Sequence, residues 1–70
     1  MKVFKLDKNN IEEVFFTVLP RDRVRVFYRW RLSPTNPWTP RKAEINTTKK
    51  ARSHWKIYIE DGFNLVVEGT

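Results

Sequence analysis

Apolar and arginine side chains alternate from residue 23 to residue 32, and this is the most regular pattern in the chain. One set of alternate positions holds Val24, Val26, Tyr28, Trp30 and Leu32, and the other holds Arg23, Arg25, Phe27, Arg29 and Arg31. A period of two places these sets on opposite faces of a β-strand, and no other regular structure separates them cleanly. We therefore predict a strand with an apolar inward face and an arginine-lined outward face.

Shorter segments on both sides show a similar alternation. Residues 2–6 predict a short strand that ends in a polar turn at residues 7–10. From residue 54 to residue 60 the alternation predicts a strand with Trp55, Ile57 and Ile59 inward and with His54, Lys56 and Tyr58 outward. Asp61-Gly62 is typical of a hairpin turn, after which residues 63–68 form the last strand.

Residues 11–19 fit two different structures. The spacing of a helix with an apolar stripe is followed by Ile11, Val14, Phe15, Val18 and Leu19, with Asn10 and Glu13 as its cap and Pro20 at its end. The same run is rich in β-branched and aromatic residues, and Pro20-Arg21-Asp22 suits a hairpin turn. We favour the strand and keep the helix as the alternative.

A Pro-rich and basic connector is expected at about 33–53. Pro34, Pro37 and Pro40 recur at intervals of three, which makes that part extended and stiff. Residues 43–53 are polar and basic with Ile45 as their one large apolar anchor, so we predict an exposed loop with a short strand near residues 43–45.

These elements predict a mainly β fold for a single basic domain spanning residues 1–70. We expect a small antiparallel sheet or a partly open barrel of about four to five short strands. The alternative is an α+β form with one helix at about 11–19 packed on the sheet. The expected core comprises Val14, Val18, Val24, Val26, Tyr28, Trp30, Trp55, Ile57, Ile59, Leu65 and Val67.

The net charge of +6 is concentrated in the middle of the chain. Residues 21–56 carry eleven Lys or Arg against Asp22 and Glu44, whereas residues 1–20 are neutral and residues 57–70 carry three acids and no base. A fold that gathers the middle segment on one side has a positive face, which attracts polyanions.

The arginine face of residues 23–31 is the strongest functional signal. Guanidinium groups pair with phosphate in a bidentate fork, and an exposed aromatic ring among them gives a base a surface for stacking. A strand at 54–60 beside it would extend this face with Lys56 and Tyr58. The candidate nucleic-acid-binding residues are Arg23, Arg25, Phe27, Arg29, Arg31, Arg41, Lys42, Lys49, Lys50, Arg52, Lys56 and Tyr58.

Other classes of site have little support in the sequence. There is no cysteine, and the single His54 cannot build a metal site alone, so we expect neither a metal nor another cofactor. No apolar run has the ~18–20 residues of a membrane span, and the amino terminus lacks the apolar stretch of a secretory signal. We expect no membrane association and a cytoplasmic or nucleoid-associated location.

Our first hypothesis is a non-enzymatic protein that binds DNA or RNA through its arginine and aromatic residues. The alternative is a small interaction or inhibitor protein that docks on an acidic surface of a partner protein, which needs the arginines but no exposed ring. A third hypothesis is a metal-free ribonuclease-like enzyme in which His54 moves a proton, and a single histidine without a positioned carboxylate makes it the weakest. A homodimer is left open, since so small a chain gains stability from association.

Overall fold

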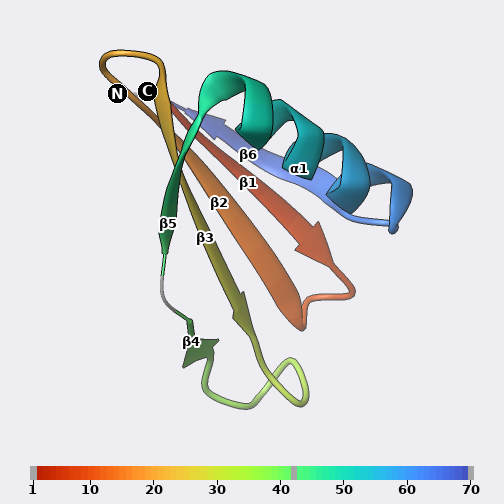
Figure 1. The fold of residues 1–70 in the computed structure, drawn as a ribbon. Helices are drawn as coiled ribbons and strands as arrows, with labels where there is room; N and C mark the ends of the chain where they lie inside the picture. Colours follow the sequence, from red (N-terminus) through yellow and green to blue (C-terminus); the bar gives the residue numbers. More distant parts are fainter. Residues whose placement is uncertain (1, 42, 70) are drawn as a thin grey trace.

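The computed structural model describes residues 2–41 and 43–69. In chain order the elements are β1 (Val3–Lys8), β2 (Glu12–Leu19), β3 (Arg23–Trp30), β4 (Thr39–Pro40), β5 (Glu44–Thr47), α1 (Thr48–Glu60) and β6 (Asn64–Gly69). The strands form an antiparallel open sheet in the order β4-β3-β2-β1-β6, and β5 also pairs with β3 (Figure 1). The predicted mainly β fold with a small antiparallel sheet is confirmed.

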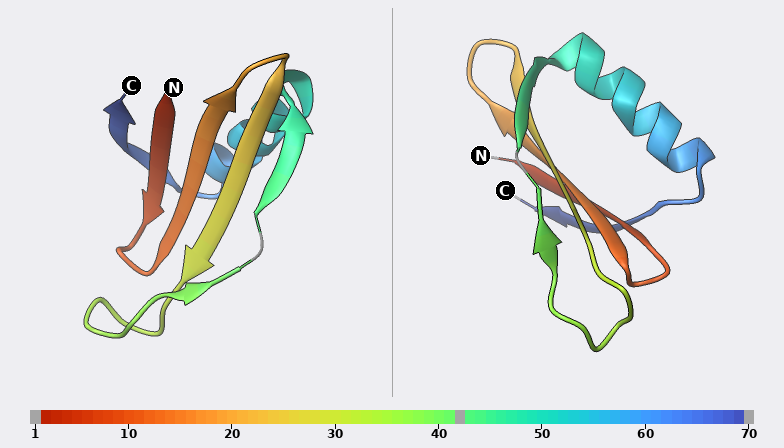
Figure 2. Two further views of the ribbon diagram at one scale, coloured as in Figure 1. Left: turned by 90° about the vertical axis from the view of Figure 1, so that its left-hand side faces the viewer. Right: turned by 60° about the horizontal axis from the view of Figure 1, so that its bottom comes forward.

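The helix α1 covers one face of the sheet and leaves the other uncovered (Figure 2). We call the covered side the inner face and the uncovered side the outer face. Val24 and Val26 of β3 point inward and are buried, so the alternate arginines of that strand point outward. The predicted division of β3 into an apolar and an arginine side is thus correct.

Residues 12–19 form the whole of β2, so the segment 11–19 is a strand and not a helix, as we favoured. The register pairs Phe15 with Phe27 and Glu13 with Arg29 along the β2–β3 hairpin. Arg21 and Asp22 turn this hairpin with positive φ angles of 62° and 59°. Because both residues adopt the left-handed conformation, the chain reverses within a few residues, and Arg21 stands at the exposed tip.

The strand predicted at residues 54–60 is wrong, because these residues belong to α1. The Thr47 side chain caps the helix by accepting a hydrogen bond from the Lys50 amide at 3.3 Å. At the other end the Gly62 amide donates to the Ile59 carbonyl, and the Phe63 amide donates to that of Tyr58. Gly62 has a φ of 99°, which suits glycine, so Asp61-Gly62 ends a helix in a Schellman motif and does not turn a hairpin.

Helical spacing explains which side of α1 reaches the sheet. Ala51, Trp55 and Tyr58 recur every three to four residues and pack inward, whereas the side chain of Ile57 is 62% exposed. The exposed loop predicted for residues 43–53 is therefore wrong where the first turns of α1 begin, whereas the short strand predicted near residues 43–45 corresponds to β5.

The core lies between α1 and the inner face. Its buried apolar side chains are Leu6, Val14, Phe16, Val24, Val26, Ala51 and Phe63, and the rings packed against them are Phe4, Tyr28, Trp55 and Tyr58. Several residues expected in the core are instead 41–62% exposed, because they lie on the solvent side of α1 or beyond its cover: Val18, Ile57, Ile59 and Leu65. Trp30 is half-buried, and the side chain of Val67 lies outside the described residues.

Candidate nucleic-acid interface

The outer face gathers cations and rings from three strands and the loop before β4. The register places Lys5 of β1 beside Phe15 of β2, and Phe15 beside Phe27 of β3. Arg25 lies opposite Ile45 of β5, whose side chain is 62% exposed. The sequence-predicted residues that this face brings together are Arg23, Arg25, Phe27, Arg29 and Arg31.

A buried carboxylate lies among these cations. The side chain of Glu13 is 4% exposed; its Oε2 lies 2.6 Å from the Lys5 Nζ, and its Oε1 lies 2.6 Å from the Arg29 Nη2. The Arg29 Nε also donates to Glu13 Oε1 at 2.8 Å. Burial by itself would raise the pKa of Glu13, but the hydrogen bonds and charges of Lys5 and Arg29 outweigh it and hold that pKa below its ordinary value. Arg29 and Lys5 are therefore already charge-paired within the protein.

The rings of the outer face are in contact with cations. Phe15 and Phe27 stack with centroids 6.1 Å apart and an interplanar angle of 23°. Trp38 has the guanidinium carbon of Arg29 at 4.6 Å and that of Arg31 at 4.0 Å from its ring centroid. These are cation–π distances, so the rings support the guanidinium groups that lie over them.

Arg31 is anchored at one end of this face. Its Nε donates to the Asn10 carbonyl oxygen at 2.9 Å, and its Nη2 donates to the Asn10 Oδ1 at 2.8 Å. Together with Trp38 this fixes the guanidinium against the β1–β2 turn. Arg31 thus links the end of β3 to the turn before β2 and keeps its positive charge.

Arg23 and Arg25 are the exposed cations of the outer face. Within the described residues neither forms a salt bridge with a carboxylate; Arg23 makes a 3.4 Å contact with the Asp22 carbonyl, and Arg25 lies 5.8 Å from the Phe27 ring centroid. Their charges are consequently available to an external anion.

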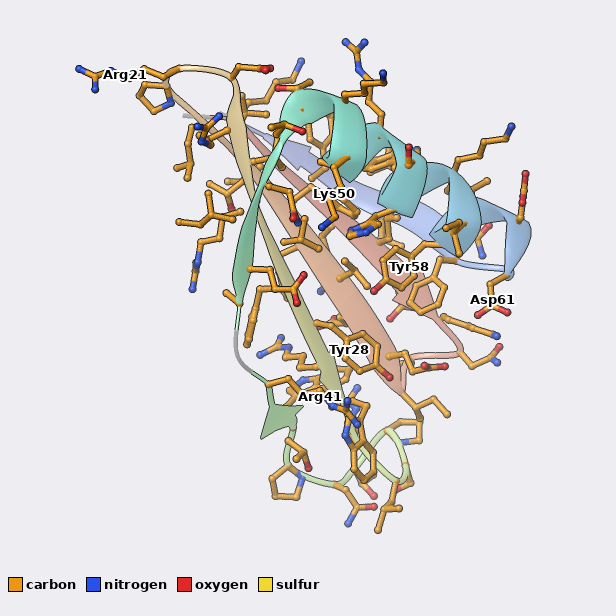
Figure 3. The ribbon with its side chains drawn as sticks, in the orientation of Figure 1. Arg21, Tyr28, Arg41, Lys50, Tyr58 and Asp61 are labelled. Carbon is orange, nitrogen blue, oxygen red and sulfur yellow. The ribbon has the colours of Figure 1, made fainter. Side chains whose placement is uncertain are left out.

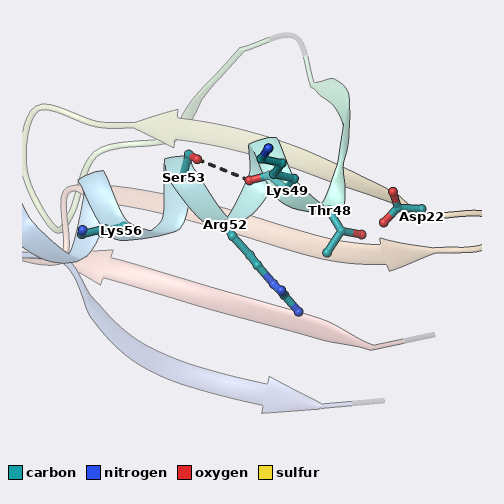
Figure 4. Close-up of a pocket in the computed structure, with 6 residues that line it drawn as sticks. All are labelled: Asp22, Thr48, Lys49, Arg52, Ser53 and Lys56. Carbon is teal, nitrogen blue, oxygen red and sulfur yellow. Dashed lines mark hydrogen bonds between the residues drawn. The ribbon is translucent and has the colours of Figure 1, made fainter.

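The basic residues that were predicted to bind at positions 49–56 lie on α1 and not on the outer face. Lys49, Arg52 and Lys56 line a shallow groove of about 580 Å³ that Asp22 borders at the hairpin tip (Figure 4). Within it the Ser53 hydroxyl donates to the Lys49 carbonyl at 3.3 Å. This helix stripe, defined by Lys49, Arg52 and Lys56, is a second cationic surface. Lys50 is exposed on the same helix, and Lys42 lies outside the described residues.

A third region, between α1 and the inner face, is acidic. A groove of about 480 Å³ is lined by the carboxylates of Glu12, Glu44 and Asp61 and also by Val26, Tyr28, Arg41, His54, Tyr58 and Phe63. Figure 3 shows Tyr28 and Tyr58 on the α1 side, with Arg41 beyond Tyr28. We call this region the acidic groove. The predicted binding residues Arg41 and Tyr58 therefore lie apart from the outer face.

The two tyrosines of the acidic groove are held neutral. Burial raises the pKa of Tyr28 to about 12, and Glu12, which accepts a 2.8 Å hydrogen bond from the hydroxyl, adds to the shift. Burial also raises the pKa of Tyr58, with the charges of Glu44 and Glu12 contributing. The Tyr58 ring packs on Phe63 at 5.0 Å, so it is part of the core and not of a stacking surface.

Sequence reasoning missed three residues of the outer face: Lys5, Glu13 and Trp38. A hairpin centred on Arg21 pairs positions whose numbers sum to 42, which would have placed Glu13 opposite Arg29. No comparable local signal brings Lys5 or Trp38 to this face, because both arrive from other parts of the chain.

The described residues contain no group of three or more His, Cys, Asp or Glu side chains arranged to hold a metal ion. No helix in the described part of the chain is long and apolar enough to cross a membrane. Comparisons with protein-family models, curated proteins and solved structures give no match.

Proposed function

We propose that the protein binds nucleic acid, without catalysis, through the outer face of its sheet. The observation that carries this proposal is the pair Arg23 and Arg25, exposed and free of carboxylate partners within the described residues, at the end of a face whose other cations are ordered on rings. Guanidinium groups bind phosphate in a bidentate fork, and groups fixed in advance lose less entropy on binding.

The distribution of acidic groups also favours the outer face as the binding surface. Glu12, Glu44 and Asp61 outnumber Arg41 in the lining of the acidic groove, although Lys8 pairs with Asp61 at 3.2 Å, so negative charge predominates there and disfavours phosphates. On the outer face, Glu13 is buried beneath its cations and is neutralised by them. A polyanion approaching the protein is therefore attracted to the outer face and kept from the acidic groove.

The experiment compares two double variants that each remove two positive charges. Arg23→Gln/Arg25→Gln changes the outer face, and Lys49→Gln/Arg52→Gln changes the helix stripe by the same amount. Binding of labelled oligonucleotides, measured by fluorescence anisotropy at two salt concentrations, should weaken about tenfold or more in the first variant. Its salt slope should fall by about one to two units, because two fewer counterions are released.

The second variant should lose clearly less affinity, and neither variant should melt below the wild-type temperature. Equal losses in the two variants would show that binding follows net charge and is not localised on the outer face, and a larger loss in the second variant would move the site to the helix stripe. A wild-type protein that binds no oligonucleotide at low salt would refute the proposal. The same arginines would then favour the alternative, docking on an acidic protein surface.

A further inference from the structure

The helix α1 covers the inner face of the sheet unevenly. Its backbone runs closest to β3 and β5, on one side of the sheet. Val18, near the end of β2, pairs with the buried Val24 and therefore points to the inner face, yet it is 41% exposed. Phe4 and Trp55 are also only partly buried. An apolar part of the inner face is thus left open beside the first turns of α1.

A groove of about 440 Å³ occupies this open part of the inner face. The apolar residues that line it come from three strands and the helix: Phe4, Phe16, Val18, Val24, Ala51 and Trp55. Thr48 and Arg52 complete the lining, so within the described residues no carboxylate borders it. We call it the apolar groove. Pockets for small molecules have volumes of about 300–1,000 Å³ and mostly apolar walls with few polar groups, and the apolar groove has both properties.

Arg52 stands where the apolar groove meets the cationic groove along α1, and it lines both. Figure 4 shows its side chain extending away from Lys49 and Ser53. Among the described residues Arg52 forms no salt bridge, even with Asp22, the acidic residue that borders the cationic groove. The aliphatic stem of an arginine lies well against apolar surface while its guanidinium pairs with an anion. Arg52 therefore suits an anionic group that is attached to an apolar chain.

The size of the apolar groove suits a small ligand better than a macromolecule. Eight residues line it, whereas a stable protein interface involves about 20–30 residues on each side. Nucleic acid has no aliphatic chain to place against these apolar walls. A single aliphatic chain, by contrast, gains about three- to fourfold in affinity for each methylene that it buries.

We infer that the apolar groove binds a small anionic amphiphile of the fatty-acid class, with one aliphatic chain and a carboxylate head. The chain lies against Val18 and Trp55, and the carboxylate pairs with the guanidinium of Arg52. This site is on the inner face, whereas the nucleic-acid interface that we propose is on the outer face. The inference therefore goes beyond the proposed function and does not depend on it.

The test is isothermal titration calorimetry of the wild-type protein without nucleic acid. The probe is dodecanoate, kept below the concentration at which it forms micelles, and we expect one saturable site per chain. Dodecyltrimethylammonium has a similar chain and the opposite charge, so it should bind at least about tenfold more weakly. Octanoate, with its shorter chain, should also bind at least about tenfold more weakly, and acetate should give no measurable binding.

Three single variants locate the site. Val18→Asn makes an exposed part of the wall polar and should weaken dodecanoate binding about fivefold or more. Arg52→Gln removes the partner of the carboxylate and should weaken it by a similar factor. The matched control is Lys49→Gln, which removes one charge from the helix stripe outside the apolar groove and should change the affinity by less than about twofold.

Equal binding of dodecanoate and dodecyltrimethylammonium, or equal losses in Arg52→Gln and Lys49→Gln, would overturn the inference, because Arg52 would then not select the head group. Absence of saturable binding would refute it outright. Self-association of the wild type that dodecanoate does not disturb and that Val18→Asn abolishes would assign the groove to a second copy of the chain. The comparison of probes on the wild-type protein decides the inference even where Val18→Asn does not fold, and none of these outcomes bears on nucleic-acid binding.

Discussion

The arginines of β3 differ in their partners, because the buried carboxylate of Glu13 pairs with only one of them. Arg29 shares the Glu13 carboxylate with Lys5, whereas Arg25 has only the Phe27 ring beside it. A buried charge that loses its partner is costly, so Arg29 contributes to stability in a way that Arg25 does not. Substitutions that test binding therefore belong at Arg23 and Arg25 and not at Arg29.

Glu13→Gln should lower the free energy of unfolding by about 1–3 kcal/mol at neutral pH, because Lys5 and Arg29 lose their charged acceptor. The pKa of Glu13 is lowered from 4.5 in the folded protein, so its ionised form stabilises the fold above about pH 4.5. That contribution is lost as the pH falls through the lowered value. Urea denaturation over this acid range should show a shallower loss of stability in the variant than in the wild type.

The control is Glu60→Gln, which removes the same charge from the exposed end of α1 and should change stability at neutral pH by less than about 0.5 kcal/mol. An acid response in Glu13→Gln as steep as that of the wild type would show that the carboxylate is not stabilised by its two cations.

At the scale of the element, α1 is charged against its own dipole. Lys49 and Lys50 stand in its first turn and Glu60 at its end, with no acidic residue in the first turn and no basic residue in the last. Cations at the amino end of a helix and anions at the carboxyl end are unfavourable. The helix is stabilised instead by its caps at Thr47 and Gly62 and by the packing of its inner side against the sheet.

Lys50→Glu should therefore raise the free energy of unfolding by about 0.5–1 kcal/mol, because it places an anion near the free amide groups of the first turn. Lys56→Glu makes the same change of charge nearer the carboxyl end and should give no gain. Thermal denaturation followed by circular dichroism measures both. A gain of equal size in the two variants would point to the relief of overall charge repulsion and not to the dipole.

At the scale of the whole molecule, stability depends on how α1 is attached to the sheet. Trp55 provides much of this contact: its ring lies edge-on to Phe4 at 5.5 Å and to Phe16 at 5.1 Å. Trp30, by contrast, is half-buried in β3 and lies outside the main buried cluster. A domain this small has about 3–5 kcal/mol of net stability from its core.

Trp55→Ala should cost about 3–5 kcal/mol and leave little folded protein, because the cavity opens between the two layers. Trp30→Ala, the same substitution in strand β3, should cost clearly less and leave a cooperative melting transition. The melting curves of the two variants test this difference. Equal destabilisation would show that β3 and its neighbours, and not the helix contact, limit the stability of the domain.

The sequence by itself determined the features that depend on neighbouring residues. The period of two in residues 23–30 placed four side chains, including Arg23, Arg25 and Arg29, on one face of β3, since alternation needs no distant contact to be read. It also indicated that β1, β2 and β3 pair in antiparallel fashion, because short turns join these consecutive segments. The concentration of positive charge in the middle of the chain was likewise evident.

Only the tertiary structure decided which of two local patterns residues 48–60 follow. Trp55, Ile57 and Ile59 alternate as in a strand, but Ala51, Trp55 and Tyr58 also share one side of a helix, and packing on the inner face favours the latter. The interaction partners of the arginines could not be predicted from neighbouring residues either. Glu13 meets Arg29 through the hairpin register, and Trp38 reaches Arg31 through a loop, so the occupied rings and the two exposed arginines follow from contacts between distant segments.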